Sequence, residues 1–355
     1  MRAWEKNFRE VEPYVPGEQP QEQQIIKLNT NENPYPPAPK VAKVLESMNT
    51  ELFKLYPDYQ SKKLVQSLAK QYEVDEKQVF VGVGSDDVLA VSFLAFFNSK
   101  TPILFPDITY SFYKVWAQLY QIPYECPKLS KDFRIVKEDY YKKNGGIVIA
   151  NPNAPTSIYE DIASIRDILD HNQESVVIID EAYIDFGGES VISLVKEYEN
   201  LLVVQTFSKS RSMAGMRIGF AIGNERLIKT LNDVKYSINS YTMNMTSIEL
   251  GTATVEENEY YKKITNRIIE TREEARVRLA ELGFETMESS TNFLFVTHKS
   301  IPAKEIFHDL NQRKIYVRHF NGDRISNYLR ITIGTPEQMN TLYDALEEIL
   351  KIKAR

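Results

Sequence analysis

Short apolar runs that end at polar residues recur along the middle of the chain. Residues 147–150, 176–179 and 201–204 consist of Val, Ile, Leu and Ala, and segments long enough for helices separate them. Runs of this length and composition predict strands buried on both faces of a parallel sheet. Polar side chains follow each run, namely Asn151, then Asp180, then the group Thr206, Ser208 and Lys209.

In open α/β sheets, ligands bind just beyond the carboxyl ends of the strands. We therefore expect the Asn151 amide, the Asp180 carboxylate and the Lys209 amine to meet in one crevice. An aromatic aldehyde cofactor held by a Schiff base needs an amine for the covalent bond and a carboxylate that keeps its ring nitrogen protonated. The pattern favours a site of that kind.

The same pattern predicts how the chain is divided. Residues 1–40 are rich in turn formers and prolines, which predicts an irregular arm. Residues 41–255 predict an α/β domain with a mostly parallel central sheet and flanking helices. Residues 256–282 predict one long helix that stops at Gly283. Residues 283–355 predict a smaller α+β domain, with strands at 292–296, 315–317 and 328–333 and helices at 303–313 and 337–352.

Composition narrows the class of protein. The 355 residues carry a formal net charge of −6 and no basic stripe, which argues against nucleic-acid binding. No apolar window is long enough for a membrane span, and residues 1–12 lack the apolar core of a signal peptide. The single cysteine, Cys126, fits a reducing compartment, and the four histidines have no metal-ligand spacing. We expect a cytoplasmic protein that uses no metal.

Several further side chains are candidates for binding a phosphorylated ring. Ser85 follows the strand-like residues 79–83 and is placed to cap a helix, whose N-terminus can bind phosphate. An ordinary cap is the alternative, and Asp86 and Asp87 would compete with an anion for the helix dipole. Arg217, eight residues after Lys209, can clamp a phosphate, although a surface ion pair would also explain it.

Two tyrosines complete the candidates drawn from the pattern alone. Tyr183 lies three residues after Asp180, close enough to reach a phenolic oxygen on the same ring. Tyr110 follows the strand-like residues 103–105, where an aromatic side chain can stack on a planar cofactor. Ordinary packing is the alternative for Tyr110.

Three motifs in this order resemble those of fold-type I pyridoxal-phosphate enzymes, the aspartate aminotransferase superfamily. Asn-Pro-Asn-Ala-Pro-Thr at 151–156 is similar to the family's Asn-Pro-x-x-Pro-Thr-Gly loop. Asp-Glu-Ala-Tyr at 180–183 is similar to its Asp-x-x-Tyr motif, and Ser208-Lys209 with the trailing Arg217 to its lysine signature. Within the superfamily the chain most resembles histidinol-phosphate aminotransferases, on the runs 28–35, 56–58, 180–186 and 328–334.

The resemblance implies a role for each matching residue. Lys209 would hold pyridoxal phosphate and act as general base, with Asp180, Tyr183 and Asn151 on the cofactor ring. The cofactor's phosphate and surroundings would be bound by Ser85, Asp86, Tyr110, Thr206, Ser208 and Arg217. A second subunit would contribute Tyr56, and the substrate would be bound by Tyr14, Asn33, Arg318 and Arg330.

One departure from the family pattern affects the 151–157 loop. Ala154 and Ser157 replace the commoner Asn and Gly. Because serine disfavours a positive φ, we expect the path of the loop to change at Ser157.

The resemblance implies a homodimeric transaminase that acts on histidinol phosphate and 2-oxoglutarate. An aromatic or broad-specificity aminotransferase and a threonine-phosphate decarboxylase share the expected cofactor site and remain alternatives. A metabolite-binding protein without catalysis also remains possible on motifs alone. A transcriptional regulator on this fold would need an added basic DNA-binding domain, for which these residues leave no room.

Overall fold

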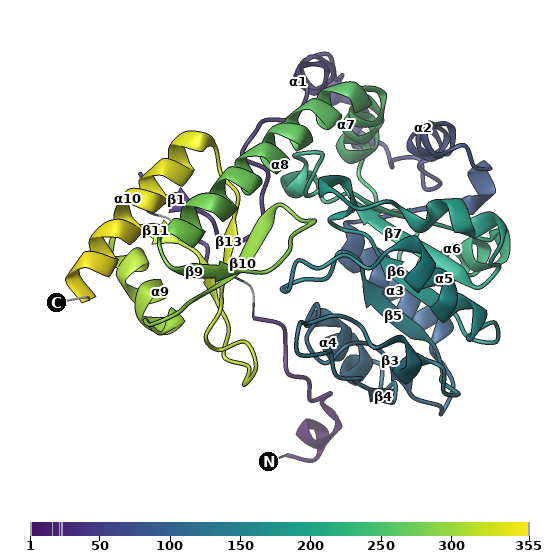
Figure 1. Cartoon of the computed structure of the whole chain (residues 1–355). Coiled ribbons are helices and arrows are strands. Elements are labelled where there is room, and N and C mark those ends of the chain that lie inside the picture. The colour runs from purple at the N-terminus through teal and green to yellow at the C-terminus, as the bar shows by residue number, and fades with distance from the viewer. Residues whose placement is uncertain (1, 16, 21, 23, 354–355) are drawn as a thin grey trace.

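The computed structural model describes residues 2–15, 17–20, 22 and 24–353. It contains a large α/β domain and a smaller α+β domain, and one long helix joins them (Figure 1). The fold class predicted from the sequence is confirmed.

The large domain is built on a seven-stranded sheet. Its order across the sheet is β2 (Val79–Gly82), β8 (Gly219–Gly223), β7 (Leu201–Thr206), β6 (Val177–Asp180), β5 (Ile147–Ala150), β3 (Ile103–Leu104) and β4 (Tyr124–Glu125). All neighbours pair in parallel except β8, which runs antiparallel to both β2 and β7. The apolar runs at 147–150, 176–179 and 201–204 form the parallel neighbours β5, β6 and β7, so their carboxyl ends share one edge of the sheet.

Alternate residues of these strands enter two different hydrophobic cores. Ile147, Val177 and Val203 pack on one face, against α1 (Pro39–Glu46), α2 (Lys62–Tyr72), α5 (Ile162–Asp170) and α7 (Met245–Glu256). Val148 and Ile178 pack on the other face, against α3 (Ser85–Phe96), α4 (Phe112–Leu119) and α6 (Glu225–Ile238). Burial on both faces explains why the strands read as unbroken apolar runs.

The small domain has an antiparallel sheet in the order β12 (Arg318–His319), β13 (Leu329–Thr332), β10 (Phe293–His298) and β9 (Phe284–Thr286). Helices α9 (Ala303–Gln312) and α10 (Pro336–Lys353) pack on its core. The predicted strand at 315–317 has a different outcome, because β11 (Ile315–Tyr316) pairs with β1 (Ile26–Lys27) of the arm.

Helix α8 (Asn258–Glu281) connects the two domains and crosses between them diagonally (Figure 1). Tyr261 and Ile264 pack in the large-domain core, while Ile268, Ala275 and Leu279 pack in the small-domain core. The helix ends just before Gly283, which has a φ of +85°. We propose that the domain boundaries expected from the sequence hold, with α8 as the connecting element.

The N-terminal arm is less irregular than its composition predicts. It contains a 3-10 turn (Ala3–Asn7) and β1, and its Leu28 is buried in the small-domain core. Residues after Leu28 then pass between the two domains (Figure 1). The parallel partner β11 and the apolar cavity for Leu28 override the turn-forming preference of the neighbouring residues.

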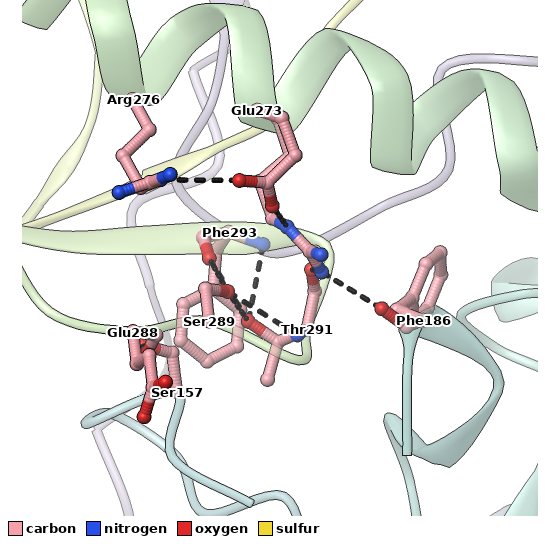
Figure 2. Close-up of polar contacts among 9 residues, drawn as sticks. Ser157, Phe186, Glu273, Arg276, Glu288, Ser289, Thr291 and Phe293 are labelled. Atoms are coloured by element: carbon pink, nitrogen blue, oxygen red, sulfur yellow. Dashed lines mark hydrogen bonds and ion pairs between the residues drawn. The ribbon is translucent and has the colours of Figure 1, made fainter.

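Polar contacts also bind the domains to each other, as Figure 2 shows around Thr291, Phe186 and Ser157. The buried guanidinium of Arg272, on α8, donates to the Phe186 and Thr291 carbonyl oxygens, both at 2.8 Å. These contacts hold the loop after β6 against the segment before β10, and therefore fix the two domains relative to each other.

Candidate active site

A cavity of about 380 Å³ opens at the carboxyl edge of β5, β6 and β7. Nine of the residues predicted to form the site line it: Ser85, Asp86, Tyr110, Asp180, Tyr183, Thr206, Ser208, Lys209 and Arg217. Their convergence follows from the parallel strand order. Thr30 and Glu32 of the arm also line the cavity, and the sequence analysis did not select them.

Asp180 ends β6 and is almost fully buried. Its carboxylate accepts a hydrogen bond from the Tyr113 hydroxyl at 2.7 Å and another from the Ala182 N–H at 3.2 Å. Burial raises the pKa of Asp180 to about 6, and the bond from Tyr113 opposes that rise. Among the described residues Asp180 forms no ion pair, although the charge of Lys209 also lowers its pKa, and a buried carboxylate of this kind is suited to pair with a cationic ligand. Tyr113 was missed, because only packing reveals a contact across 67 residues.

Lys209 points into the cavity from the loop after β7. Its Nζ donates to the Thr30 carbonyl oxygen at 3.2 Å and lies 5.6 Å from the centre of the Tyr183 ring. Asn33 fixes the lysine backbone, since its Nδ2 donates to the carbonyl oxygens of Lys209 and Ser210. The predicted substrate residue Asn33 therefore contacts the lysine loop in this structure and does not line the cavity. Its role toward substrate stays a prediction.

Several hydrogen-bond donors lie close together at the end of the cavity where α3 begins. Arg217 lies across Gly84, so closely that a Cβ on Gly84 would be 2.5 Å from Nη2. Thr206 and Ser208 hydroxyls lie 3.0 Å apart beside it. The helix N-cap is Gly84, with a φ of +86°, and not Ser85 as predicted. Only glycine leaves space for the guanidinium to cover the helix N-terminus.

Asp86 forms an ion pair with Arg217, and its predicted competition with an anion for the helix dipole stays a prediction. Its carboxylate lies 3.1 Å from Arg217 Nη2 and accepts a bond from the Tyr110 hydroxyl at 2.8 Å. Burial, together with Asp86, raises the pKa of Tyr110 well above its usual value, so the phenol remains protonated. Asp86 therefore orients both Arg217 and Tyr110, which line the cavity with it.

Two predicted cofactor residues do not line the cavity. Asn151 is buried, but both ends of its amide bond the backbone of Glu160 at 2.8 Å. Tyr56 is 80% exposed and stacks on Tyr241 with ring centres 4.6 Å apart. Their contact with a cofactor stays a prediction.

Two arginines of the small domain are neighbours on its sheet. Arg318 and Arg330 are directly opposite each other in the β12–β13 pair, so their side chains share one face of the sheet. Arg330 donates to the Asn29 carbonyl oxygen at 2.8 Å, while its buried Nε has no partner. Among the described residues no carboxylate lies within ion-pair distance of either guanidinium. Two adjacent cations without counter-ions predict an anion between them.

Tyr14 lies near this region without lining the cavity. Its ring stacks on Phe112 at 4.2 Å and is 6.4 Å from Tyr110. Arg330 packs on Phe293, whose ring contacts Tyr183 with centres 5.2 Å apart. The small-domain arginines, the arm and the cavity thus form one region.

The 151–157 loop does not avoid a positive φ, which corrects the expectation for Ser157. Ser157 has a φ of 67° and is fully buried. Its hydroxyl donates to the carbonyl oxygen of Glu288 at 2.8 Å, and both residues are drawn in Figure 2. Its own carbonyl accepts from the Ser290 N–H at 3.0 Å. Bonds to the small domain offset the cost of a left-handed serine, about 1–2 kcal/mol.

The chain matches the family model for aminotransferase class I and II over residues 23–346. It belongs to that family. It is 48% identical to a histidinol-phosphate aminotransferase of Clostridium botulinum (strain Okra / Type B1), over 98% of this chain and 99% of the relative. It is 49% identical to the enzyme of that name from Lactococcus lactis subsp. cremoris (strain SK11), over 99% of both chains. These matches confirm the family resemblance found in the motifs.

A solved structure of a histidinol-phosphate aminotransferase from Sinorhizobium meliloti, in complex with pyridoxal-5'-phosphate, has the same fold. The TM-score is 0.85 with 19% sequence identity, over 92% of this chain and 91% of the other. In the described part of the chain, no helix is long and apolar enough to cross a membrane.

Proposed function

We propose that this aminotransferase uses pyridoxal phosphate to move an amino group between histidinol phosphate and 2-oxoglutarate. The observation that carries the substrate assignment is the pair Arg318 and Arg330, for which no carboxylate lies within ion-pair distance in the described part of the chain. Arg330 packs on the Phe293 ring, and Phe293 in turn contacts Tyr183, which lines the Lys209 cavity. The names of the relatives at 48–49% identity support the same substrate.

The cavity fits pyridoxal phosphate in size and in the kind of side chain at each end. The Gly84 turn, Ser85, Thr206, Ser208 and Arg217 supply phosphate donors, and glycine is required for their close approach. The buried Asp180 would pair with a pyridinium nitrogen, and Lys209 would form the covalent bond. When bound, pyridoxal phosphate accepts the electrons released as the substrate loses its α-proton.

The residues of the chain bind, orient and move protons around that group. Asp180 holds a negative charge at a buried point, and Tyr113 keeps its carboxylate in place. The Lys209 amine, when free, would be placed to accept and return a proton of the substrate. Asn33 holds the backbone of Lys209 beside the cavity. Tyr110 covers the cavity on the side of Asp86.

Arg318 and Arg330 are expected to bind the phosphate of the amino donor. A guanidinium offers two parallel N–H groups to a phosphate, and Phe293 and Phe320 hold the Arg330 side chain at 5.3 and 5.8 Å. Tyr14 would provide an additional donor near the same anion. This arrangement favours a phosphorylated donor over an unphosphorylated aromatic amino acid.

Replacing Arg330 with alanine is expected to reduce kcat/KM for histidinol phosphate by about ten- to a hundredfold, because a hydrogen bond to a charged group contributes roughly 1.5–3 kcal/mol. Activity with unphosphorylated histidinol is expected to change little. Steady-state kinetics with both donors measures the difference. The matched control is Arg313→Ala, which replaces an arginine of the small domain that bonds its own helix, at the Asp309 carbonyl oxygen, and lies 3.9 Å from Glu348 on α10.

Equal weakening toward both donors would show that Arg330 binds a carboxylate or is structural. An aromatic or broad-specificity aminotransferase would then be the better assignment. Release of carbon dioxide from threonine phosphate without amino transfer would instead favour the decarboxylase.

We further propose that the enzyme is a homodimer. Apolar side chains at 45–80% exposure gather around the segment between α1 and α2 and the end of α6, namely Leu52, Phe53, Leu55, Tyr56, Tyr59 and Tyr241. An apolar surface of this kind is typical of a protein interface. A second copy covering it would bring Tyr56 toward the partner's cavity. A cytoplasmic location, without metal, membrane or nucleic-acid partners, completes the proposal.

The dimer is tested by mixing two inactive variants, Tyr56→Ala and Lys209→Ala, and allowing subunits to exchange. If Tyr56 serves the partner's site, a hybrid dimer contains one complete site and partial activity returns. Subunit exchange is verified by native mass spectrometry of differently labelled chains. Exchange without recovery would place Tyr56 in its own subunit's site or outside both sites.

A further inference from the structure

Asn31 occupies an unusual position in the arm, between the two domains. It is 1% exposed and has a φ of 57°, in the left-handed region that asparagine tolerates better than most residues. Asn31 belongs to the run 28–35, which carries part of the family resemblance, but the sequence alone assigned Asn31 no role. Its contacts in the folded chain assign it one.

All the polar groups of Asn31 are engaged, and they reach both domains. Its Nδ2 donates to the Tyr183 hydroxyl at 2.9 Å, on the large-domain side of the cavity. On the small-domain side, its Oδ1 accepts from the Thr332 hydroxyl at 3.0 Å, and its backbone N–H donates to the same hydroxyl at 3.0 Å. Its carbonyl oxygen accepts from Asn292.

These bonds decide which way the Asn31 amide faces. The Thr332 hydroxyl already accepts the Asn31 N–H, so its own hydrogen needs an acceptor, and Oδ1 is the one beside it. The amide oxygen is therefore turned to Thr332, and the amide NH₂ group to Tyr183. In a reversed amide the NH₂ group would face the Thr332 hydroxyl, which needs an acceptor, and the oxygen would face the Tyr183 hydroxyl.

The orientation of the amide in turn orients the Tyr183 hydroxyl. Because this hydroxyl accepts from Asn31, its single hydrogen must be donated in another direction. Among the described residues it has no acceptor, and the Tyr183 side chain lines the cavity. The ring itself is held edge-on by Phe293, with centres 5.2 Å apart. The hydrogen is thus available to a ligand in the cavity.

We propose that Asn31 is a positioning residue that directs the Tyr183 O–H toward the phenolic oxygen of the cofactor. The inference rests on the proposed function for the identity of that cofactor, but not for the identity of the amino donor. Thr332 and Arg330 are two residues apart on β13, so their side chains share a face. One asparagine therefore also sets the distance between the cofactor tyrosine and the strand of the phosphate arginine.

The consequence is a shift in a measurable titration. A hydrogen bond donated to a phenolic oxygen stabilises its deprotonated form and lowers the pH of the transition. In protein loaded with pyridoxal phosphate, the midpoint of the visible absorbance change with pH is expected to rise by about one unit in Asn31→Ala. Asn31→Asp should raise it further, because a carboxylate would take the Tyr183 hydrogen for itself.

A double-mutant cycle separates positioning from a general structural effect. Tyr183→Phe removes the hydrogen altogether, so adding Asn31→Ala in that background is expected to cause no further shift. Asn29→Ala is the matched control, since Asn29 is equally buried on the same arm but its side chain bonds Glu18. Thr332→Val removes the hydroxyl that bonds the Asn31 Oδ1 and backbone N–H but leaves the bond from Asn31 Nδ2 to Tyr183, and is expected to give a smaller shift in the same direction.

An unchanged midpoint in Asn31→Ala, or an equal shift with and without the Tyr183 hydroxyl, would overturn the proposal. The affinity for pyridoxal phosphate, measured by titrating it into the apo protein and following fluorescence, provides a second readout. This affinity should weaken in the same order among the variants. No amino donor enters either measurement. An error in the assignment of histidinol phosphate therefore leaves both results unchanged.

Discussion

Lys209→Ala is expected to lose the visible absorbance of the purified protein and to reduce amino transfer by about a thousandfold or more. Lys209 lines the cavity, and its Nζ is held beside Tyr183 by the Thr30 carbonyl oxygen. Without that amine no covalent bond to the cofactor forms and no base is present to move the proton. The fold should be preserved, because alanine deletes only cavity-facing atoms.

Lys235 provides a demanding control for this result. It is also buried, burial lowers its pKa to about 8, and it could therefore act as a nucleophile at neutral pH. However, its Nζ donates to the Val81 carbonyl oxygen and does not line the cavity. Lys235→Met is expected to keep the absorbance. If borohydride still fixes cofactor to Lys209→Ala and not to Lys235→Met, the assignment of the active lysine is wrong.

Asp180→Asn is expected to slow turnover by about a hundred- to a thousandfold while the protein still binds pyridoxal phosphate. A neutral amide cannot hold the pyridine nitrogen protonated, and a loss of two to three pKa-equivalents corresponds to about 3–4 kcal/mol. Steady-state turnover and equilibrium binding of the cofactor measure the two effects separately. Turnover close to that of the wild type would exclude Asp180 as the partner of the ring nitrogen.

Although Asp180→Asn is expected to slow turnover, it is not expected to destabilise the apo protein. Because burial raises the pKa of Asp180 to about 6, the folded state keeps its proton while the unfolded chain releases it. Stability of the apo protein therefore falls as pH rises from about 4 to 6, by about 2–3 kcal/mol for this group. Asp180→Asn is expected to remove that part of the pH dependence of the free energy of unfolding, measured by denaturant melts. At pH 8 the apo variant should therefore be no less stable than the apo wild type.

Glu181→Gln is the matched control, since Glu181 is the adjacent buried carboxyl group. Burial raises its pKa to about 7, but it bonds Ser190, Val191 and Gln205 and does not line the cavity. It is expected to alter the pH dependence of apo stability and to leave most of the turnover intact. A similar loss of turnover in both variants would mean that burial, not contact with the cofactor, makes Asp180 important.

The central sheet and the core of the site were predictable from local pattern. Short apolar runs separated by helix-length segments are typical of strands buried on both faces of a parallel sheet, and β5, β6 and β7 occupy that position. Polar residues at their ends must then share one edge, which is why Asp180, Thr206, Ser208 and Lys209 all line the cavity. Apolar residues recur at helical spacing along residues 256–282, and this local pattern was sufficient to predict α8.

Other features depend on contacts between distant segments, and no local pattern encodes them. Tyr113 meets Asp180 across 67 residues, and Asn31 meets Tyr183 across 152 and Thr332 across 301. The φ of Ser157 was misjudged because its preference was weighed without Glu288 and Ser290, which bond it from the small domain. By itself the sequence determined which residues lie at strand ends, because hydrophobic burial acts along each segment. Only the tertiary structure decided their hydrogen-bond partners, because a buried polar group must pair with whatever group the packing of the two domains brings beside it.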